Sequence, residues 1–302
     1  MSGPLADAPV VERRDVAHLD EAAWLQQHLA SVDAPVLDGR RYPGFPDEST
    51  QKAFVGSAYA DALGEAARFY GYVREQTDAM RMRLTGGRYL DFGAGWGRIG
   101  RFFLRDFERG DMAAVDVDPG MVAFCRNAAV PGHHLTVQQG EPLPFANGAF
   151  RLVTAYSVFT HLPRPVFEAW MDELLRVTAP GGLIVFTLEP ERFLDFVAEI
   201  DPHAPESGWH AALRGQLGDL ETRRADLHAN GYTYLSTGGG AYRGPEVYGD
   251  MVVTPGFVSE VVARNGQLLS YLDDPGRFWQ ALAVVRRSWW RHRPRAAAPQ
   301  QG

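Results

Sequence analysis

The 302-residue chain has very little cysteine and lysine, with Cys125 and Lys52 as its single representatives. One cysteine cannot form an intramolecular disulfide. Nearly all of the 30 basic residues are arginine, which we attribute to genome composition because they follow no single motif. No apolar run approaches the length of a membrane span, and residues 1–20 lack the apolar core of a signal peptide. We therefore expect a cytoplasmic protein with no membrane partner.

Positive charge is also scarce overall, since the formal net charge is -7. This balance argues against a nucleic-acid partner, because such proteins usually present a basic face. The exception is residues 286–295, RRSWWRHRPR, which could grip phosphates and stack on bases. We interpret this stretch instead as a strand end followed by a solvated tail, and we expect residues 288–302 to be disordered.

The most informative stretch is residues 88–98, RYLDFGAGWGR. A short apolar strand ends at Asp91, glycines follow at every second position, and a helix is expected over 99–107. Glycines lack the Cβ atoms that keep a ligand away from the main chain. Free amides at the start of a helix can hold a negative group. The pattern therefore predicts a nucleoside cofactor at this turn.

Two cofactors are compatible with the glycine pattern. Residues 95–100, GWGRIG, fit the dinucleotide fingerprint G-x-G-x-x-G, and Asp116 lies near the spacing of a ribose-binding acid. This reading indicates an NAD(P)-dependent oxidoreductase. However, Asp91 would repel a pyrophosphate. S-adenosylmethionine instead brings an ammonium that suits Asp91 and a carboxylate that suits the amides near 95–97.

A second acidic strand end supports S-adenosylmethionine. Residues 112–117, MAAVDV, are apolar apart from Asp116, and the pair Asp118-Pro119 follows. We expect Asp118 to cap a helix over 120–128 with Pro119 in its first position. Asp116 is then left at the strand end to accept hydrogen bonds from both ribose hydroxyls.

Strands and helices alternate through the middle of the chain. Strands are expected near 88–92, 112–117, 134–138, 151–156 and 183–188, and helices near 96–107, 119–128 and 165–177. This alternation predicts an α/β fold with a parallel sheet covered by helices on both faces. Its ligand should lie at the carboxyl ends of the strands.

Four segments in order resemble class I S-adenosylmethionine-dependent methyltransferases. They are residues 90–98 (LDFGAGWGR), 114–118 (AVDVD), 138–150 (QQGEPLPFANGAF) and 174–187 (LLRVTAPGGLIVFT). The resemblance covers roughly residues 86–188, with a weaker echo at 250–287. It implies a Rossmann-like sheet of seven mostly parallel strands, completed by a strand pair at 267–272 and 279–286.

The resemblance also implies a set of cofactor-binding residues. They are Asp91, Gly93, Gly95, Trp96, Gly97, Asp116, Val117, Gln139, Gly140 and Tyr156. Gln139 stands where the family often has an aspartate on the adenine amino group, and it can accept that hydrogen bond without charge assistance. Arg151 also departs from the family and is given no role. Tyr156 lines the cleft or fills the core.

The organisation of the chain follows from this core. We expect an N-terminal helical extension over 1–85, with a long helix or a broken pair at 57–84, and a cofactor-binding core over 86–188. Residues 189–250 are an insertion with helical pieces at 191–200 and 213–229, and residues 251–287 complete the core. So long a connection is unusual. It is interpreted as a substrate lid, with packing or a dimer surface as the alternative.

His161 is the best candidate for a catalytic base. It follows the fourth strand in the segment 156–162, YSVFTHL, near the expected position of the methyl group. A structural role for His161 is the alternative, and three histidines of the insertion (His203, His210 and His228) are weaker candidates. No metal site is expected, because His133 and His134 would point to opposite faces of a strand.

The leading hypothesis is an S-adenosylmethionine-dependent methyltransferase that acts on oxygen or nitrogen of a small-molecule or sugar-like acceptor, a glycan included. The enzyme would mainly position the acceptor for in-line displacement. A monomer or a homodimer is expected. The alternatives are an NAD(P)-dependent oxidoreductase and a binding protein that keeps the cofactor fold without chemistry.

Overall fold

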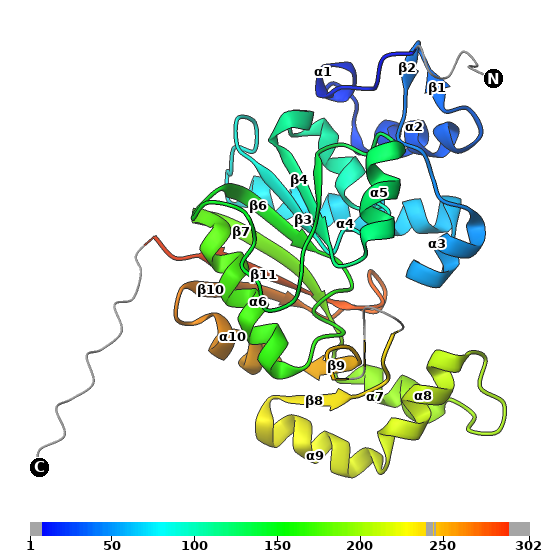
Figure 1. Ribbon diagram of the computed structural model, residues 1–302. Coiled ribbons are helices and arrows are strands. Elements are labelled where there is room, and N and C mark those ends of the chain that lie inside the picture. The colour runs from blue at the N-terminus through cyan, green and yellow to red at the C-terminus, as the bar shows by residue number, and fades with distance from the viewer. Residues whose placement is uncertain (1–7, 240–243, 245, 290–302) are drawn as a thin grey trace, which may run out of the picture.

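The computed structural model describes residues 8–239, 244 and 246–289. Seven strands form the central sheet in the order β10-β11-β7-β6-β3-β4-β5 (Figure 1). They are β3 (Tyr89–Phe92), β4 (Met112–Asp116), β5 (His133–Thr136), β6 (Phe150–Ala155), β7 (Thr178–Leu188), β10 (Gly266–Leu272) and β11 (Ala281–Arg287). β3 to β7 are parallel, whereas β11 is antiparallel to both of its neighbours. The expected seven-stranded, mostly parallel sheet is confirmed.

Side chains alternate between the two faces of the sheet, as in any strand. On one face, Leu90, Val153 and Ile184 join a core cluster with α6 (Arg164–Val177) and α10 (Pro255–Val262). On the other face, Tyr89, Leu152 and Val185 pack with the N-terminal helices and with residues 99–107. The parallel sheet is therefore buried on both sides, as its near-continuous apolar strands require.

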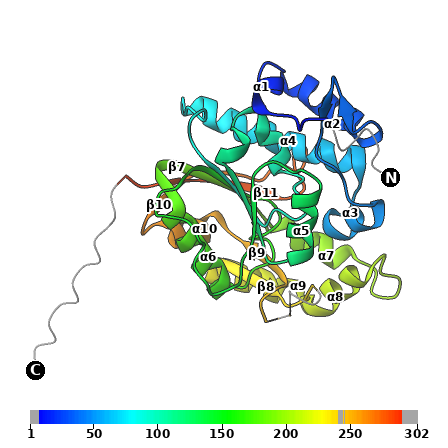
Figure 2. The same ribbon diagram turned by 45° about the horizontal axis from the view of Figure 1, so that its top comes forward.

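The N-terminal part wraps around one side of this core (Figure 2). Its elements are α1 (Arg13–Val16), α2 (Glu21–Asp33), the short pair β1 (Val36–Leu37) and β2 (Arg40–Arg41), α3 (Glu48–Val55) and α4 (Tyr59–Ala79). The stretch at 57–84 thus contains one long helix, and its buried Leu63, Phe69 and Val73 face the sheet cluster.

Two elements near the glycine turn show how local sequence controls structure. α5 (Pro119–Asn127) begins as expected, because the Asp118 side chain accepts hydrogen bonds from the amides of Gly120 and Met121. The α-helix expected over 99–107 is wrong. The chain instead makes turns and a short 3₁₀ helix, η1 (Gly100–Arg105), followed by a second, η2 (Arg109–Asp111). The Gly100 amide is taken by the Asp91 side chain, so the segment starts on a side-chain hydrogen bond.

The segment 189–250 forms a separate lobe beside the sheet (Figure 1). It contains α7 (Arg192–Glu199), α8 (Gly208–Leu217), α9 (Leu220–Asn230) and β8 (Tyr232–Leu235), and it ends at the first residue of β9 (Asp250–Val253). The single helix expected over 213–229 is wrong, because Gly218 has a positive φ of 65° and Asp219 caps a new helix. β8 pairs with β9, where the sequence indicated only a loop.

The C-terminal strand pair is found where the resemblance placed it, in β10 and β11. Arg286 and Arg287 belong to β11, and Arg287 donates a hydrogen bond to the Thr178 carbonyl. The start of the basic run is therefore part of the sheet, while its remainder from 290 onward lies outside the described residues. Within the described residues, no helix is both long and apolar enough to cross a membrane.

Candidate functional site

A cavity of about 190 Å³ opens at the carboxyl ends of β3, β4 and β6, where an α/β sheet of this kind binds its ligand. Several of the residues proposed from the sequence line it: Gly93, Gly95, Trp96, Asp116, Val117, Gln139, Tyr156 and His161. Asp91, Gly97 and Gly140 do not. Phe54 and Val55 of α3 also line it, so the N-terminal part contributes to the site.

Packing and backbone hydrogen bonds constrain the glycine turn. Gly93 has a φ of 74°, and a Cβ atom there would lie 2.3 Å from Cγ2 of Val158, a cavity-lining residue. The amides of Gly93 and Ala94 donate to the Val115 carbonyl, and that of Gly95 donates to Asp116. The expectation of free amides near 95–97 is therefore wrong for Gly95, and also for Gly97, whose amide donates to the Ala94 carbonyl. A pyrophosphate would not find them available.

Asp91 does not take the position expected for it. Its side chain lies on the same face as Tyr89, is 2% exposed, and accepts hydrogen bonds from the Gly100 amide at 2.9 Å and the Thr154 hydroxyl at 3.4 Å. Burial raises the pKa of Asp91 to about 7, although these hydrogen bonds act against the rise. In this structure the Asp91 carboxylate holds the turn through the Gly100 amide and does not line the cavity.

Asp116 remains at the cavity, at the end of β4. Its Oδ2 accepts the Gly95 amide at 2.7 Å and its Oδ1 accepts the Asp118 amide at 2.9 Å. A carboxylate has about four lone-pair sites, and these two bonds fix its orientation at the cavity. The carboxylate is more constrained than the sequence suggested.

A network around Glu65 of α4 was not foreseen from the sequence. Glu65 pairs with Arg98 of the glycine turn and accepts a hydrogen bond from the Tyr156 hydroxyl at 2.7 Å. The Arg98 guanidinium lies 4.9 Å from the centre of the Tyr156 ring. Both side chains line the cavity, so Arg98 is a cation at the site. In the sequence, the position of Arg98 directly after Gly97 was the signal that could have identified it as a site residue.

Trp96, Val117, Gln139 and Gly140 lie in different surroundings. Trp96 is 1% exposed and packs beside Phe45, with ring centres 6.2 Å apart. Val117 and Gln139 are exposed residues on the cavity lining. Gly140 is exposed next to Gln139 but does not reach the lining.

His161, which also lines the cavity, is held by residues from the end of the 189–250 segment. Its Nδ1 lies 2.8 Å from the Gly249 carbonyl oxygen and 3.5 Å from Oδ1 of Asp250. Its ring stacks on Tyr248, with centres 4.4 Å apart. A carbonyl oxygen only accepts, so Nδ1 carries the hydrogen and Nε2 is left to face a ligand. Burial lowers the pKa of His161, but Asp250, the Gly249 carbonyl and Glu189 outweigh it and raise that pKa above its usual value.

Buried polar groups surround His161, and the sequence gave no indication of them. Gln280 donates through Nε2 to the Ser157 hydroxyl and to Oε1 of Glu189, both at 3.0 Å. Ser157 lines the cavity with a φ of 57°, an unusual conformation for a residue other than glycine. Burial raises the pKa of Glu189 to about 7. These residues come from distant parts of the chain, so no local pattern could have revealed them.

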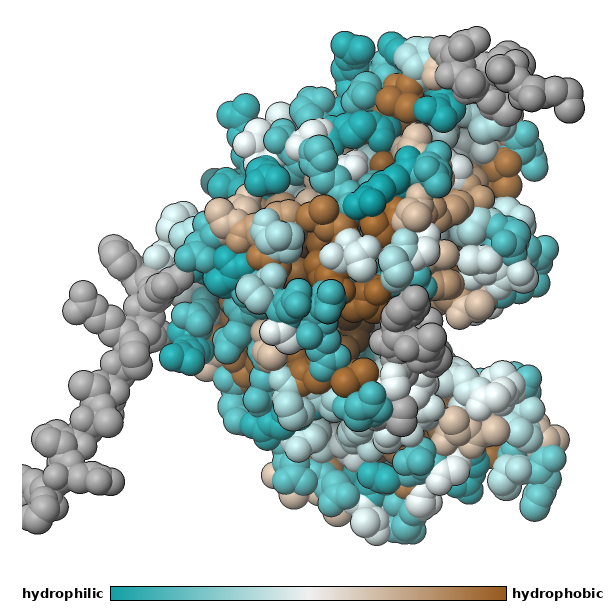
Figure 3. Space-filling model, viewed as in Figure 1, coloured by the Kyte–Doolittle hydropathy of each residue, from teal (hydrophilic) through white to brown (hydrophobic). Residues whose placement is uncertain are grey.

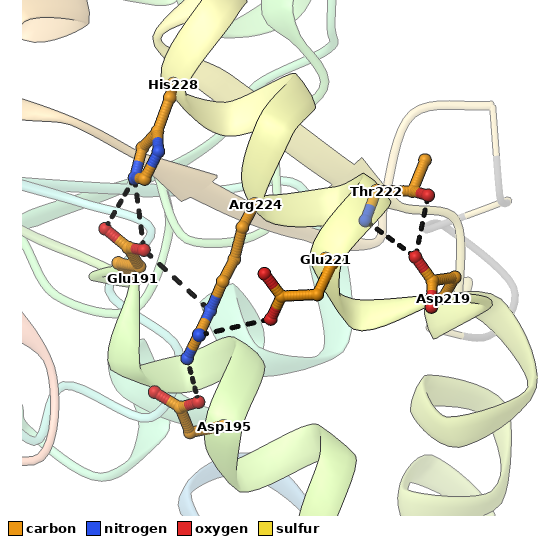
Figure 4. A network of polar contacts seen from close by, with 7 residues as sticks. All are labelled: Glu191, Asp195, Asp219, Glu221, Thr222, Arg224 and His228. Carbon is orange, nitrogen blue, oxygen red and sulfur yellow. Dashed lines mark hydrogen bonds and ion pairs between the residues drawn. The ribbon is translucent and has the colours of Figure 1, made fainter.

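The other candidate histidines do not join this group. His228 is exposed and contacts Glu191, in a network where Arg224 pairs with Glu191, Asp195 and Glu221 and so ties α9 to α7 (Figure 4). His203 is exposed, and His210 makes an edge-to-face contact with Phe196 on α7. Among the described residues, no group of three or more His, Cys, Asp or Glu side chains could hold a metal ion.

The residues present fit S-adenosylmethionine better than a dinucleotide. Asp116 offers a fixed acceptor for ribose hydroxyls, and Arg98, although paired with Glu65, places a guanidinium on the cavity lining. The turn amides that would bind a pyrophosphate already donate within the protein. A Cβ at Gly100, the third glycine of the dinucleotide pattern, would lie 2.8 Å from the Asp91 carboxylate. That glycine is thus required by the buried acid.

Comparisons with known proteins agree. Residues 90–182 match a family described as a methyltransferase domain. A methyltransferase of Mycobacterium sp. strain KMS is 36% identical over 135 residues, which cover 41% of this chain and 50% of the relative. The malonyl-[acyl-carrier protein] O-methyltransferase of Methylococcus capsulatus is 27% identical over 203 residues, covering 62% of this chain and 69% of that protein. The chain thus spans about half the length of the first relatives it matches.

A solved structure shows the same fold. It is the magnesium protoporphyrin IX methyltransferase of Synechocystis PCC 6803 with bound S-adenosylhomocysteine, at a TM-score of 0.50 and 12% identity, covering 80% of this chain and 94% of that one. At this identity the likeness concerns the fold alone. The sequence match identifies residues 90–182 as a methyltransferase domain, and the solved structure supports its fold.

Proposed function

We propose that this protein transfers a methyl group from S-adenosylmethionine to a hydroxyl or amine of a small-molecule acceptor, with His161 as the general base. The observation that carries the proposal is the placement of Asp116 and His161 on the lining of one cavity. Asp116 provides the acceptor for the ribose hydroxyls, and His161 provides the base. These are the two functions that such a transfer needs from the protein.

Residues of the glycine turn and of β4 would hold the cofactor. Asp116 accepts hydrogen bonds from the ribose hydroxyls, and Arg98 pairs with the carboxylate of the amino-acid end. Val117 and Gln139 form the exposed edge where the adenine would lie. The bound cofactor supplies a methyl group activated by a positively charged sulfur. Asp91 keeps the turn in shape.

His161 serves the acceptor. With hydrogen on Nδ1, its Nε2 can take a proton from an acceptor hydroxyl or amine as that atom becomes bonded to the methyl carbon. Good orientation of the two reactants is worth roughly 7–11 kcal/mol, and proton removal adds about 10²–10⁴-fold. The base is therefore useful only for acceptors that must lose a proton.

Acceptors that are already carboxylates fit this site less well. The M. capsulatus relative is named as an O-methyltransferase of malonyl-acyl carrier protein. In this chain, Asp250 and Glu189 lie buried close to His161. The Asp250 carboxylate opposes the approach of another carboxylate, and Glu189, with its pKa raised to about 7, adds to this repulsion when it is ionised. We therefore favour a hydroxyl or amine acceptor, a sugar included.

Binding and transfer assays test the proposal. Thermal unfolding with S-adenosylhomocysteine, NAD and NADP should show stabilisation by the first compound alone, because binding to the folded state raises the unfolding temperature. Transfer of a labelled methyl group into alcohols, phenols, sugars and amines should then identify the acceptor. Stabilisation by NAD alone would instead favour an oxidoreductase. Binding of the homocysteine analogue without transfer to any acceptor would favour a binding protein.

A further inference from the structure

The two ends of the 189–250 segment carry buried carboxylates that meet at one place. Glu189 is 3% exposed and Asp250 is 0% exposed, although 60 residues separate them in the chain. Glu189 forms a bridge with Val252, and Asp250 lies two residues before Val252 on the same strand. Because strand side chains alternate with a period of two, the two acids project from the same face.

Both acids keep an oxygen without a conventional hydrogen bond among the described residues. Oδ2 of Asp250 accepts hydrogen bonds from Thr237 at 2.7 Å and from the Trp209 ring at 3.2 Å, while Oδ1 has none and lies 3.5 Å from Nδ1 of His161. Oε1 of Glu189 accepts from Gln280, while Oε2 has no partner. A buried carboxylate oxygen left without a donor is unfavourable unless a positive charge forms nearby.

The group that can supply this charge is His161. Its side chain is 16% exposed, and the neighbours that act on it are Asp250 of β9, Glu189 after β7, the Gly249 carbonyl and the stacked Tyr248 ring. Apart from the His161–Asp250 contact, no ion pair to Asp250 or Glu189 is found among the described residues, although the Arg192 guanidinium acts on Glu189 and works against the rise of its pKa. The ring therefore faces two acids, and Arg192 acts on one of them.

We propose that Asp250 and Glu189 are positioning residues that act through His161, stabilising the positive charge that its ring gains with the acceptor's proton. This rests on the proposed function. In the transfer step the acceptor's O–H or N–H bond breaks and its proton moves to Nε2, while the acceptor–carbon bond forms and the carbon–sulfur bond breaks. The sulfur loses its positive charge as the imidazole gains one, so charge is conserved. The two ends of the 189–250 segment thus complete the base.

Nitrogen-15 NMR of histidine in the full chain tests the proposal without any acceptor. A His161→Gln spectrum assigns the signals. In the unsubstituted protein, neutral His161 should carry its hydrogen on Nδ1 and titrate above the usual value of about 6.5. Asp250→Asn should lower the pKa of His161 by about 1 to 3, as expected for loss of an adjacent opposite charge, and Glu189→Gln should lower it by less. Asp226→Asn, an exposed acid of the same segment, should leave it unchanged.

Two results would overturn the proposal. One is a His161 with hydrogen on Nε2 in the unsubstituted protein, a measurement that does not depend on any variant folding. The other is an unchanged pKa of His161 in Asp250→Asn. S-adenosylhomocysteine affinity is measured on the same samples. If the pKa of His161 responds to Asp250→Asn as expected but S-adenosylhomocysteine does not bind, the proposed function alone is contradicted. If S-adenosylhomocysteine binds but Asp250→Asn leaves the pKa of His161 unchanged, this inference alone is contradicted.

Discussion

The cofactor side and the acceptor side of the cavity are built in different ways. Most of the proposed cofactor side comes from one stretch, from the glycine turn after β3 to Asp116 and Asp118 after β4, and Gln139 is added from the segment after β5. The acceptor side is assembled from four separated stretches that contribute Ser157, Glu189, Asp250 and Gln280 around His161. The cofactor side depends on local backbone geometry. The acceptor side depends on the lobe of α7–α9 remaining packed beside the sheet.

The division between the main body and the lobe is also visible at the surface. In Figure 3, apolar surface gathers in the middle of the face shown, and a notch separates the main body from the lower lobe that contains α8 and α9. Inside the lobe, ion pairs around Arg224 and a small apolar cluster with Leu213 and Leu227 hold the helices together. A change on the acceptor side should therefore alter catalysis, whereas a change in the glycine turn should alter binding and folding together.

The largest effect is expected from the base. His161→Gln should lower the rate of methyl transfer to an acceptor found in the panel above by about 10²–10⁴-fold. Its affinity for S-adenosylhomocysteine should stay unchanged, because the histidine acts on the acceptor. Steady-state kinetics and calorimetry separate the two. His228→Gln is the control, since His228 is 61% exposed and pairs with Glu191 in the lobe. Equal rates in both variants would remove His161 from the chemistry.

The next effect concerns the glycine turn. Gly93→Ala places a side chain in the left-handed region, at about 1–2 kcal/mol, and forces it against Val158, at about 1–3 kcal/mol more. Denaturant unfolding should show this loss together with weakened S-adenosylhomocysteine binding. Gly86→Ala is matched in φ, at 80°, but has no neighbour within 4 Å. It should show the backbone cost alone and bind normally. Equal losses in the two variants would contradict the packing argument.

A smaller effect is expected from the ribose contact. Asp116→Ala should weaken cofactor binding by about 2–4 kcal/mol through lost charge-assisted hydrogen bonds. Asp118→Ala is the comparison, because it removes the cap of α5, for about 0.5–2 kcal/mol of stability, and leaves Asp116 in place. Calorimetry with S-adenosylhomocysteine measures both. Unchanged affinity in Asp116→Ala would rule out the ribose contact.

The smallest effect on binding should come from Asp91. Because its carboxylate does not line the cavity, Asp91→Asn should keep S-adenosylhomocysteine affinity within a few fold. A large loss of affinity would restore the direct contact with the ammonium that the sequence suggested.

Stability should change in a pH-dependent way in the same variant. The pKa of Asp91 is about 7 in the folded protein and about 3.9 when unfolded, so the folded state holds its proton more tightly. The free energy of unfolding therefore falls as pH rises from about 4 to 7. Asp91→Asn should flatten this fall in urea titrations at a series of pH values. Glu189, with a pKa of about 7, leaves part of the slope in place.

The sequence predicted the strands around the glycine turn and the start of α5 because their signals are local. Alternating strands, the glycine spacing and the Asp118-Pro119 start of α5 are each contained within a few residues. Asp91 was misread because a strand-ending acid has the same local pattern whichever way it points. The alternation of side chains along a strand could have corrected this prediction, because it places Asp91 on the same face as Tyr89. Tyr89 is a core residue that stacks on Phe103.

The acceptor side could be predicted only in part. His161 was found because it follows β6 at the carboxyl edge of the sheet. Its partners Asp250 and Glu189 were not, because their approach to His161 depends on the bridge between Glu189 and Val252 and on the fold of the whole lobe. Such contacts between distant residues leave no periodic signal in the chain.

The central claim is that one cavity holds the cofactor at Asp116 and presents its reactive end to His161. A crystal structure of the complex with S-adenosylhomocysteine tests this most directly. The account predicts ribose hydroxyls within hydrogen-bonding distance of the Asp116 carboxylate and the sulfur on the side of the cavity that His161 lines. Analogue bound outside this cavity, or inside it with the sulfur turned away from His161, would contradict the account.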